Sequence, residues 1–156
     1  NSVVKPDDTV FYLGDVTMGN VQEGLRFLKT FNGRKFLVPG NHDRVFSDRS
    51  QTEYNKYEKM YLDVFSEILP EQVDYFNWLL CHFPYLNDHT QEARYKDKRP
   101  KDDGRILLCG HVHDLWKSNG KQINVGVDVW DWYPVSETMI TDTITAMEWY
   151  PLVEKM

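Results

Sequence analysis

The stretch Phe36-Leu37-Val38-Pro39-Gly40-Asn41-His42-Asp43 decides the fold class of this chain. Its first three residues form a short apolar run, typical of a strand that is buried on both faces. Proline and glycine then end the strand and leave three polar side chains at its carboxyl end. Upstream, Thr9 to Leu13 is a second apolar run that ends at Gly14-Asp15, and between the two runs Asn20 to Phe31 has apolar residues at helical spacing. Strand, helix and strand in this order predict a βαβ unit and therefore an α/β fold.

The rest of the chain predicts further strands and helices. They are a helix at 51–68, strands at 73–76, 78–81, 105–109 and 122–127, and a helix at 136–149. The polar stretch from Asn87 to Asp103 is expected to be a loop. Because the order mixes βα and ββ units, we expect an α/β sandwich in which helices cover a core of two sheets. With 156 residues, 41% of them apolar, the chain can build the core of one domain.

Four of the predicted strands end in side chains that can bind metal ions or act as acids. These side chains are Asp15, Asn41, His42, Asp43, His82, His111 and His113. Four of the five histidines belong to this set, and only His89 lies in the polar loop. Ligands in α/β folds bind beyond the carboxyl ends of the strands, so we expect these side chains to converge. Imidazole, carboxylate and amide ligands without cysteine suit Mn²⁺, Fe, Ni²⁺ or Zn²⁺.

The strand-end side chains lie in four short motifs, in the order Gly14-Asp15, Gly40-Asn41-His42-Asp43, His82 and Gly110-His111-Val112-His113. In order and spacing they resemble the motifs of the calcineurin-like metallophosphoesterases. The resemblance implies a single domain over residues 1–156 with a two-sheet α/β/β/α sandwich. In this family a first strand ends in an Asp-x-His motif, and no such motif occurs before Leu13. We therefore expect the first strand to be missing and the domain to be truncated at its N-terminus.

The resemblance also implies a role for each strand-end side chain. The metal ligands would be Asp15, Asn41, His82, His111 and His113. Two divalent ions are expected, Mn²⁺ above the others, with Asp15 bridging them and His113 in the second subsite. A hydroxide that bridges the ions would be the nucleophile. His42 would protonate the leaving oxygen, and Asp43 would hold its imidazole in the right tautomer.

The function implied is metal-dependent hydrolysis of phosphate esters, as a phosphodiesterase or a phosphomonoesterase acting on a small molecule or a nucleotide. One alternative is a non-catalytic metal-binding scaffold of the same fold, since the Asp-x-His motif is absent. The other is a nuclease of the same superfamily. A net charge of -6 argues against a surface for general nucleic-acid binding.

Two further features concern the compartment. Cys81 and Cys109 each end an apolar run, which predicts buried free thiols and a reducing compartment. No stretch of 18 apolar residues is present, so no membrane span is expected. We expect a cytoplasmic protein.

Overall fold

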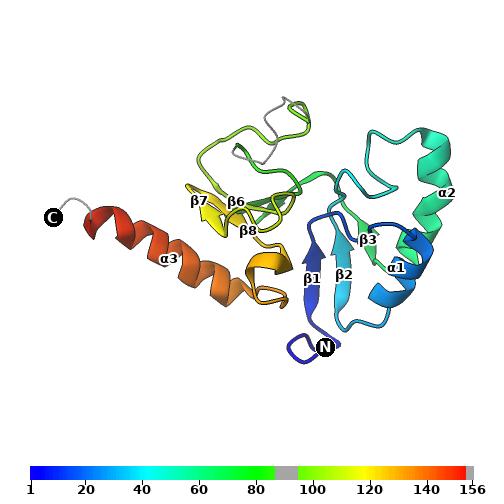
Figure 1. Ribbon diagram of the computed structural model, residues 1–156, viewed down its shortest axis with the longest axis horizontal. Helices are drawn as coiled ribbons and strands as arrows, with labels where there is room; N and C mark the ends of the chain where they lie inside the picture. Colours follow the sequence, from blue (N-terminus) through cyan, green and yellow to red (C-terminus); the bar gives the residue numbers. More distant parts are fainter. Residues whose placement is uncertain (87–94, 154–156) are drawn as a thin grey trace.

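The computed structural model describes residues 1–86 and 95–153, and for 148–153 only the course of the backbone. Figure 1 shows its elements. In chain order they are β1 (Thr9–Tyr12), α1 (Val21–Leu28), β2 (Arg34–Leu37), α2 (Gln51–Leu62), β3 (Glu67–Ile68), β4 (Gln72–Tyr75), β5 (Trp78–Cys81), β6 (Ile106–Cys109), β7 (Ser118–Asn119), β8 (Gln122–Asn124), the 3₁₀ helix η1 (Val127–Val129) and α3 (Glu137–Val153).

The first sheet has the order β1-β2-β3, and all three strands are parallel. Helix α1 connects β1 to β2, which confirms the predicted βαβ unit. Asn20 is the predicted N-cap, and its side chain accepts a hydrogen bond from the backbone amide of Glu23 at 3.3 Å. The helix ends at Leu28, three residues before the predicted end at Phe31.

The second sheet has the order β4-β5-β6-β8-β7. Strands β4 and β5 form an antiparallel pair, whereas β5, β6 and β8 are parallel neighbours. The carboxyl ends of these three strands therefore lie at the same edge of the sheet. This edge faces the carboxyl ends of β1 and β2, so residues from both sheets can meet there (Figure 1).

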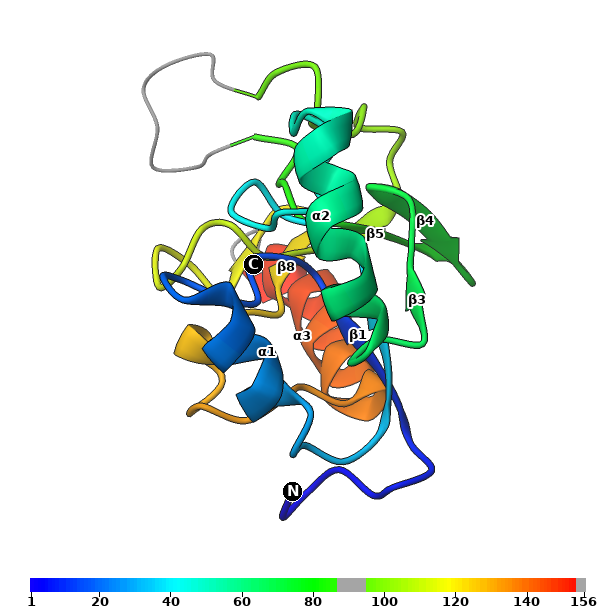
Figure 2. The ribbon, with the colours of Figure 1, turned by 90° about the vertical axis from the view of Figure 1, so that its right-hand side faces the viewer.

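The core is built in layers, as the alternation of side chains along each strand requires. Helices α1 and α2 cover one face of the first sheet (Figure 2) and pack around the buried side chain of Tyr61. The opposite face packs against the second sheet. That inter-sheet core consists of Leu13, Val38, Leu80, Leu108 and Ile123, with Trp130 and Ile140 beside them. The two-sheet α/β fold is therefore confirmed.

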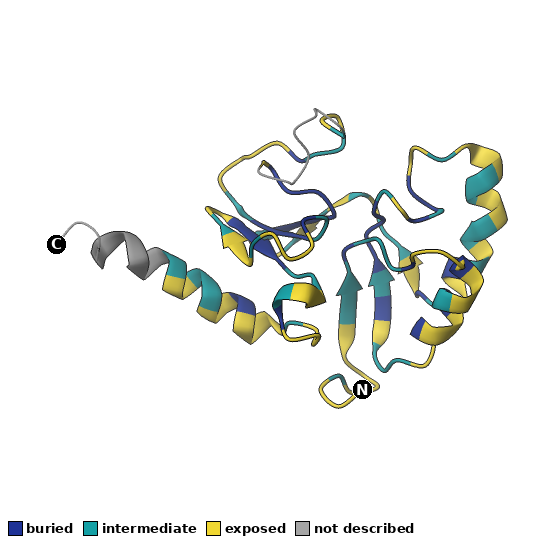
Figure 3. Cartoon of the chain, in the orientation of Figure 1, coloured by how far each residue is buried: buried dark blue, intermediate teal, exposed yellow. Residues whose placement is uncertain are grey.

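The outer face of the second sheet is covered mainly by loop residues. Its buried side chains are Phe46, Leu79, Cys81, Phe83, Tyr85, Leu107 and Cys109. Helix α3 packs against the inter-sheet core through Ile140, with Ile144 and Met147 partly buried beside it, and its other described side chains are mainly exposed (Figure 3). Both cysteines are free and buried, as predicted, and burial raises the pKa of the Cys81 thiol to about 12.

The boundaries of several elements differ from the sequence prediction. The helix predicted over 51–68 ends at Leu62, because the following segment pairs with β2: the amide of Ser66 donates to the carbonyl of Lys35 at 2.8 Å. The strand predicted over 122–127 ends at Asn124, and η1 follows it. The short strands β3 and β7 were not predicted.

The stretch from Asn87 to Asp103 was predicted to be a loop. Residues 95–103 form turns and irregular backbone, as expected, while 87–94, including His89, lie outside the described residues. Among the described helices, none is long and apolar enough to cross a membrane.

Candidate metal centre and active site

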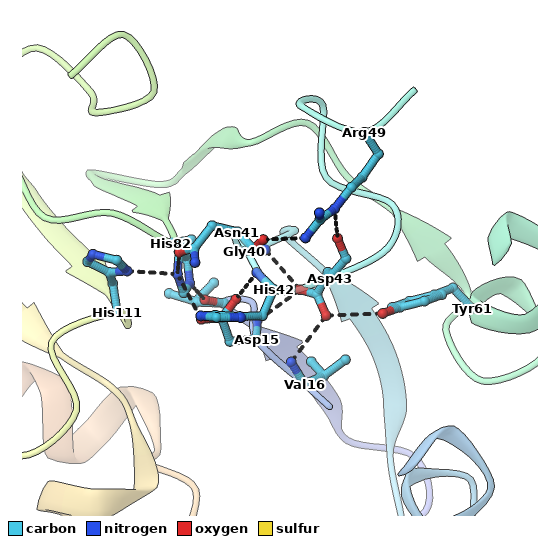
Figure 4. Close-up of polar contacts among 11 residues, drawn as sticks. Asp15, Val16, Gly40, Asn41, His42, Asp43, Arg49, Tyr61, His82 and His111 are labelled. Atoms are coloured by element: carbon cyan, nitrogen blue, oxygen red, sulfur yellow. Dashed lines mark hydrogen bonds and ion pairs between the residues drawn. The ribbon is translucent and has the colours of Figure 1, made fainter. Parts of the chain in front are cut away.

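Four of the predicted ligands meet at one point between the two sheets. Asp15 follows β1, Asn41 follows β2, His82 follows β5 and His111 follows β6. The imidazole nitrogen Nε2 of His82 lies at the centre of the group (Figure 4). From it, Asn41 Oδ1 is at 3.1 Å, His111 Nδ1 at 3.2 Å and Asp15 Oδ2 at 3.4 Å. The convergence expected from the strand ends is therefore present for these four residues.

The hydrogen-bonding state of His82 shows that the group fits a cation. Its Nδ1 lies 2.7 Å from the carbonyl oxygen of Leu13, so this nitrogen carries the proton and donates it. Nε2 then faces the oxygens of Asn41 and Asp15 at 3.1 and 3.4 Å. With a lone pair there, three acceptors would face one another and repel, so a positive charge belongs at this point, supplied either by a second proton on Nε2 or by a bound cation.

The electrostatics of Asp15 keep a negative charge at this point. Burial alone would raise the pKa of its carboxyl, but contacts with His82 and the backbone amide of His42 outweigh burial and lower that pKa. The His42 amide donates to Asp15 Oδ1 at 2.8 Å. Asp15 is therefore a carboxylate, which is the form that binds metal.

Two glycines allow the strand ends to approach so closely. Gly14 has φ +89°, a conformation that favours glycine, and a Cβ placed there would lie 2.5 Å from the backbone nitrogen of Gly40. A Cβ on Gly40 would lie 2.6 Å from the backbone nitrogen of Asp15 and 2.7 Å from the ring of His82. The backbones of the two turns are therefore in direct contact around the His82 imidazole.

Asp43 has a different role from the one expected. Its carboxylate is fully buried and accepts hydrogen bonds from the amides of Gly40 and Asp15, both at 2.8 Å, and of Val16 at 3.2 Å. The hydroxyl of Tyr61 adds a fourth at 3.3 Å. Among the described residues, no hydrogen bond joins Asp43 to the imidazole of the exposed His42, so the expected support of that ring by Asp43 is corrected. The carboxylate instead ties the two turns together, because main-chain amides surround it.

Burial raises the pKa values of both Asp43 and Tyr61. It raises the pKa of Asp43, against the effect of the amide of Gly40, and the charge of nearby Asp15 raises it further. Burial, and then the charge of Asp43, raise the pKa of Tyr61 to about 12. The phenol therefore stays protonated near neutral pH and can donate to the carboxylate.

His113 lies apart from the four converging ligands. It follows His111 by two residues, is exposed, and is not part of the group of close ligand atoms that includes Asp15, His82 and His111. Its carbonyl accepts a hydrogen bond from the side-chain nitrogen of Asn124 at 2.7 Å.

Three residues that support the site were not predicted from the sequence. Asn124, fully buried at the end of β8, also donates to the carbonyl of Trp116 at 3.0 Å and so fixes the loop after β6. Arg49 donates to the carbonyls of Asn41 at 2.8 Å and Asp43 at 3.3 Å, and Tyr61 binds Asp43. None of them belongs to a sequence motif. Their supporting role is recognised only from the hydrogen bonds that their side chains form in the folded protein.

Comparison with known proteins agrees with this geometry. Residues 1–145 match the calcineurin-like phosphoesterase family. The chain belongs to that family. This supports a metal-dependent phosphoesterase in general terms, and the four converging ligands are the part of the chain that fits such a role.

Several proteins are similar to this chain over most of its length. The chain is 36% identical over 155 residues to the Gene 66 protein of Mycobacterium phage D29, covering 89% of this chain and 78% of the relative. The Gene 66 protein of Mycobacterium phage L5 is 35% identical over 83% of this chain and 70% of the relative. A crystal structure of a protein of unknown function from Aquifex aeolicus aligns with a TM-score of 0.59 at 30% identity, covering 91% of this chain and 79% of that one.

Proposed function

We propose that this chain hydrolyses phosphate esters of small molecules or nucleotides, as a phosphomonoesterase or a phosphodiesterase. The observation that supports the proposal is the meeting of Asp15, Asn41, His82 and His111, with His82 Nε2 directed at the oxygens of Asn41 and Asp15. Such a group of acceptors needs a positive charge among them, which a divalent ion supplies, and the chain belongs to the calcineurin-like phosphoesterase family.

The residues that would hold a first ion are proposed from this geometry, and those for a second ion from the family resemblance. Asp15, Asn41, His82 and His111 would hold one divalent ion, and His113 would help to hold a second, with Asp15 shared between them. Mn²⁺ is the ion we propose first, and Fe, Ni²⁺ or Zn²⁺ suit the same ligands. When bound, such ions supply Lewis-acid stabilisation of the phosphoryl oxygens and activate water for attack.

His42 is the residue proposed to move a proton. It is exposed beside Asp15, to which its own backbone amide is bound, so its ring can reach a group that leaves phosphorus at the metal site. A protonated imidazole there would donate its proton to the leaving oxygen. In the part of the chain that the structure describes, Asp43 and Arg49 form hydrogen bonds to the backbone of the 40–43 turn and so help to position His42.

The leaving-group dependence of hydrolysis tests this assignment. We expect the Mn²⁺-loaded protein to hydrolyse 4-nitrophenyl phosphate or bis(4-nitrophenyl) phosphate. His42→Ala should reduce the hydrolysis of an alkyl phosphate, whose leaving oxygen needs a proton, by roughly 10²–10⁴-fold. Nitrophenolate leaves without a proton, so its release should fall much less. An equal loss for both leaving groups would contradict the acid role, and no hydrolysis of any ester would contradict the function.

His113 lies outside the first group of ligand atoms, as a ligand of a second ion would, so the number of bound ions distinguishes the enzyme from a metal-binding scaffold without catalysis. Equilibrium dialysis followed by elemental analysis measures the number of ions per chain. About two ions per chain support the enzyme, and one or none support the scaffold. A nuclease would instead be revealed by cleavage of single-stranded or duplex DNA.

A further inference from the structure

A small pocket opens next to the converging ligands, on the side of His42. It has a volume of about 110 Å³, and its lining includes Thr17, Gly19, His42, Arg44 and Arg49. Thr17 lies two residues after Asp15, and Arg49 binds the carbonyl of Asn41 (Figure 4), so the pocket adjoins the metal ligands.

The pocket has a positive charge that the chain as a whole does not have. The net charge of the protein is -6, yet the described residues that line the pocket include two arginines and no acidic side chain. Gly19 and Val21 also line it, and Val21 is the first residue of α1, where the helix dipole adds a positive potential. These features favour an anion.

Both guanidinium groups are held in place before any ligand binds. Arg49 donates from Nε to the carbonyl of Asp43 and from one terminal nitrogen to the carbonyl of Asn41. A guanidinium has five N–H groups, so others remain to bind a ligand. Arg44 forms an ion pair with Glu53 at 2.9 Å, and its guanidinium lies 5.9 Å from the centre of the Tyr57 ring. Donors that are already ordered lose little side-chain entropy on binding.

The size of the pocket limits the ligand. Pockets for drug-sized molecules have about 300–1,000 Å³, and a water molecule takes about 30 Å³ in the liquid. A volume of about 110 Å³ therefore suits a phosphate or carboxylate group and is too small to enclose a nucleobase with its sugar.

We propose that this pocket binds a second anionic group of the substrate, a phosphate or a carboxylate carried by the leaving group. The proposal rests on the proposed function, in which His42 protonates the leaving oxygen. Because His42 lines the pocket, whatever is attached to that oxygen lies towards Arg44 and Arg49. The substrate class is thus a small phosphate ester with an additional negative charge, and the acidic chain argues against a polynucleotide.

Matched aryl phosphates test the proposal. The kcat/KM of the Mn²⁺-loaded protein is measured for phenyl phosphate and for 3- and 4-carboxyphenyl phosphate. We expect the ratio of kcat/KM for the better carboxylated ester to kcat/KM for phenyl phosphate to be about ten, which corresponds to one charge-assisted hydrogen bond. This ratio should fall to about one in Arg44→Gln and be largely recovered in Arg44→Lys. It should stay at the wild-type value in Arg34→Gln, which removes an exposed arginine that does not line the pocket.

A second variant shifts the ratio in the opposite direction. Glu53 pairs with Arg44 but does not line the pocket. Glu53→Gln removes the negative charge that offsets the guanidinium, while the amide oxygen can still accept its hydrogen bond, so the ratio should rise severalfold. An unchanged ratio in both Arg44→Gln and Glu53→Gln overturns the proposal. A wild-type preference for phenyl phosphate, or faster cleavage of a single-stranded oligonucleotide than of any aryl phosphate, overturns it as well.

Binding separates failure of this proposal from failure of the proposed function. Calorimetric titration with phenylphosphonate and 4-carboxyphenylphosphonate requires no hydrolysis. Tighter binding of the carboxylated ligand that depends on Arg44, in a protein that hydrolyses nothing, supports the anion pocket and refutes the enzyme. Hydrolysis with equal affinity for both ligands supports the enzyme and refutes the pocket.

Discussion

The replacement of Asp43 tests how the active-site turns are held together. Its carboxylate accepts from the amides of Gly40, Asp15 and Val16 and from the hydroxyl of Tyr61 in a fully buried position. Asp43→Ala leaves three backbone donors without this acceptor. A buried unsatisfied donor costs about 1–3 kcal/mol, and the turns can relax in part, so we expect unfolding free energy to fall by about 3–5 kcal/mol. This is a large share of a typical stability of about 5–15 kcal/mol.

Asp43→Asn should cost less, for a reason visible in the structure. Oδ2 faces two main-chain amides, of Gly40 and Asp15, so the oxygen of the new side chain must take that position. Its NH₂ group then faces Val16 and Tyr61 in place of Oδ1. The Tyr61 hydroxyl can rotate to accept, whereas the Val16 amide cannot. One hydrogen bond is lost, and removal of the buried charge offsets part of the loss, so we expect about 1–2 kcal/mol.

Urea denaturation followed by circular dichroism measures these differences. EDTA is present throughout, so that loss of metal affinity does not enter the free energies. Asp7→Ala, which removes an exposed aspartate, is the control and should stay within about 0.5 kcal/mol of the wild type. The reasoning is refuted if Asp43→Ala costs less than about 1 kcal/mol, or if Asp43→Asn costs as much as Asp43→Ala.

Three further predictions concern the same region. Gly40→Ala places a Cβ 2.6 Å from the backbone nitrogen of Asp15, so metal content measured by elemental analysis should fall to background; retention of a full complement would contradict the tight contact. Asn124→Ala removes hydrogen bonds to two loop carbonyls, and we expect roughly tenfold weaker Mn²⁺ binding in calorimetric titration; unchanged affinity would separate this loop from the metal site. Mn²⁺ at about 100 times its dissociation constant should add about 2.7 kcal/mol to the stability of the metal-free protein, a rise in Tm of roughly 5–11 °C by calorimetry; no rise would show that the ligands do not bind metal in the native state.

The ligand group was predictable because it depends on local sequence. Apolar runs that end in glycine, proline and polar residues mark the ends of buried strands, and parallel strands bring those ends to one edge. Asp15, Asn41, His82 and His111 were therefore identified before any geometry was known, together with the βαβ unit and the two-sheet fold.

Other features depend on pairings between distant segments, which a single sequence does not show. Ile68 continues the helical spacing of the apolar residues in α2. Residues 67–68 nevertheless form a strand, because they pair with the edge of β2. Asp43 stands beside His42 in the sequence, yet successive residues in a turn can point in different directions, and its carboxylate turns inward to main-chain amides.

The sequence by itself determined which residues can bind a metal and that they lie at strand ends. Only the tertiary structure decided that His113 is outside the group of ligand atoms that meet, and that Arg44 and Arg49 border the same site. The physical reason is that strand ends are set by short-range apolar patterns. The directions of side chains within turns are set by hydrogen bonds to residues that can be 18 or 28 positions away, as for Asp43 with Tyr61 and Asp15.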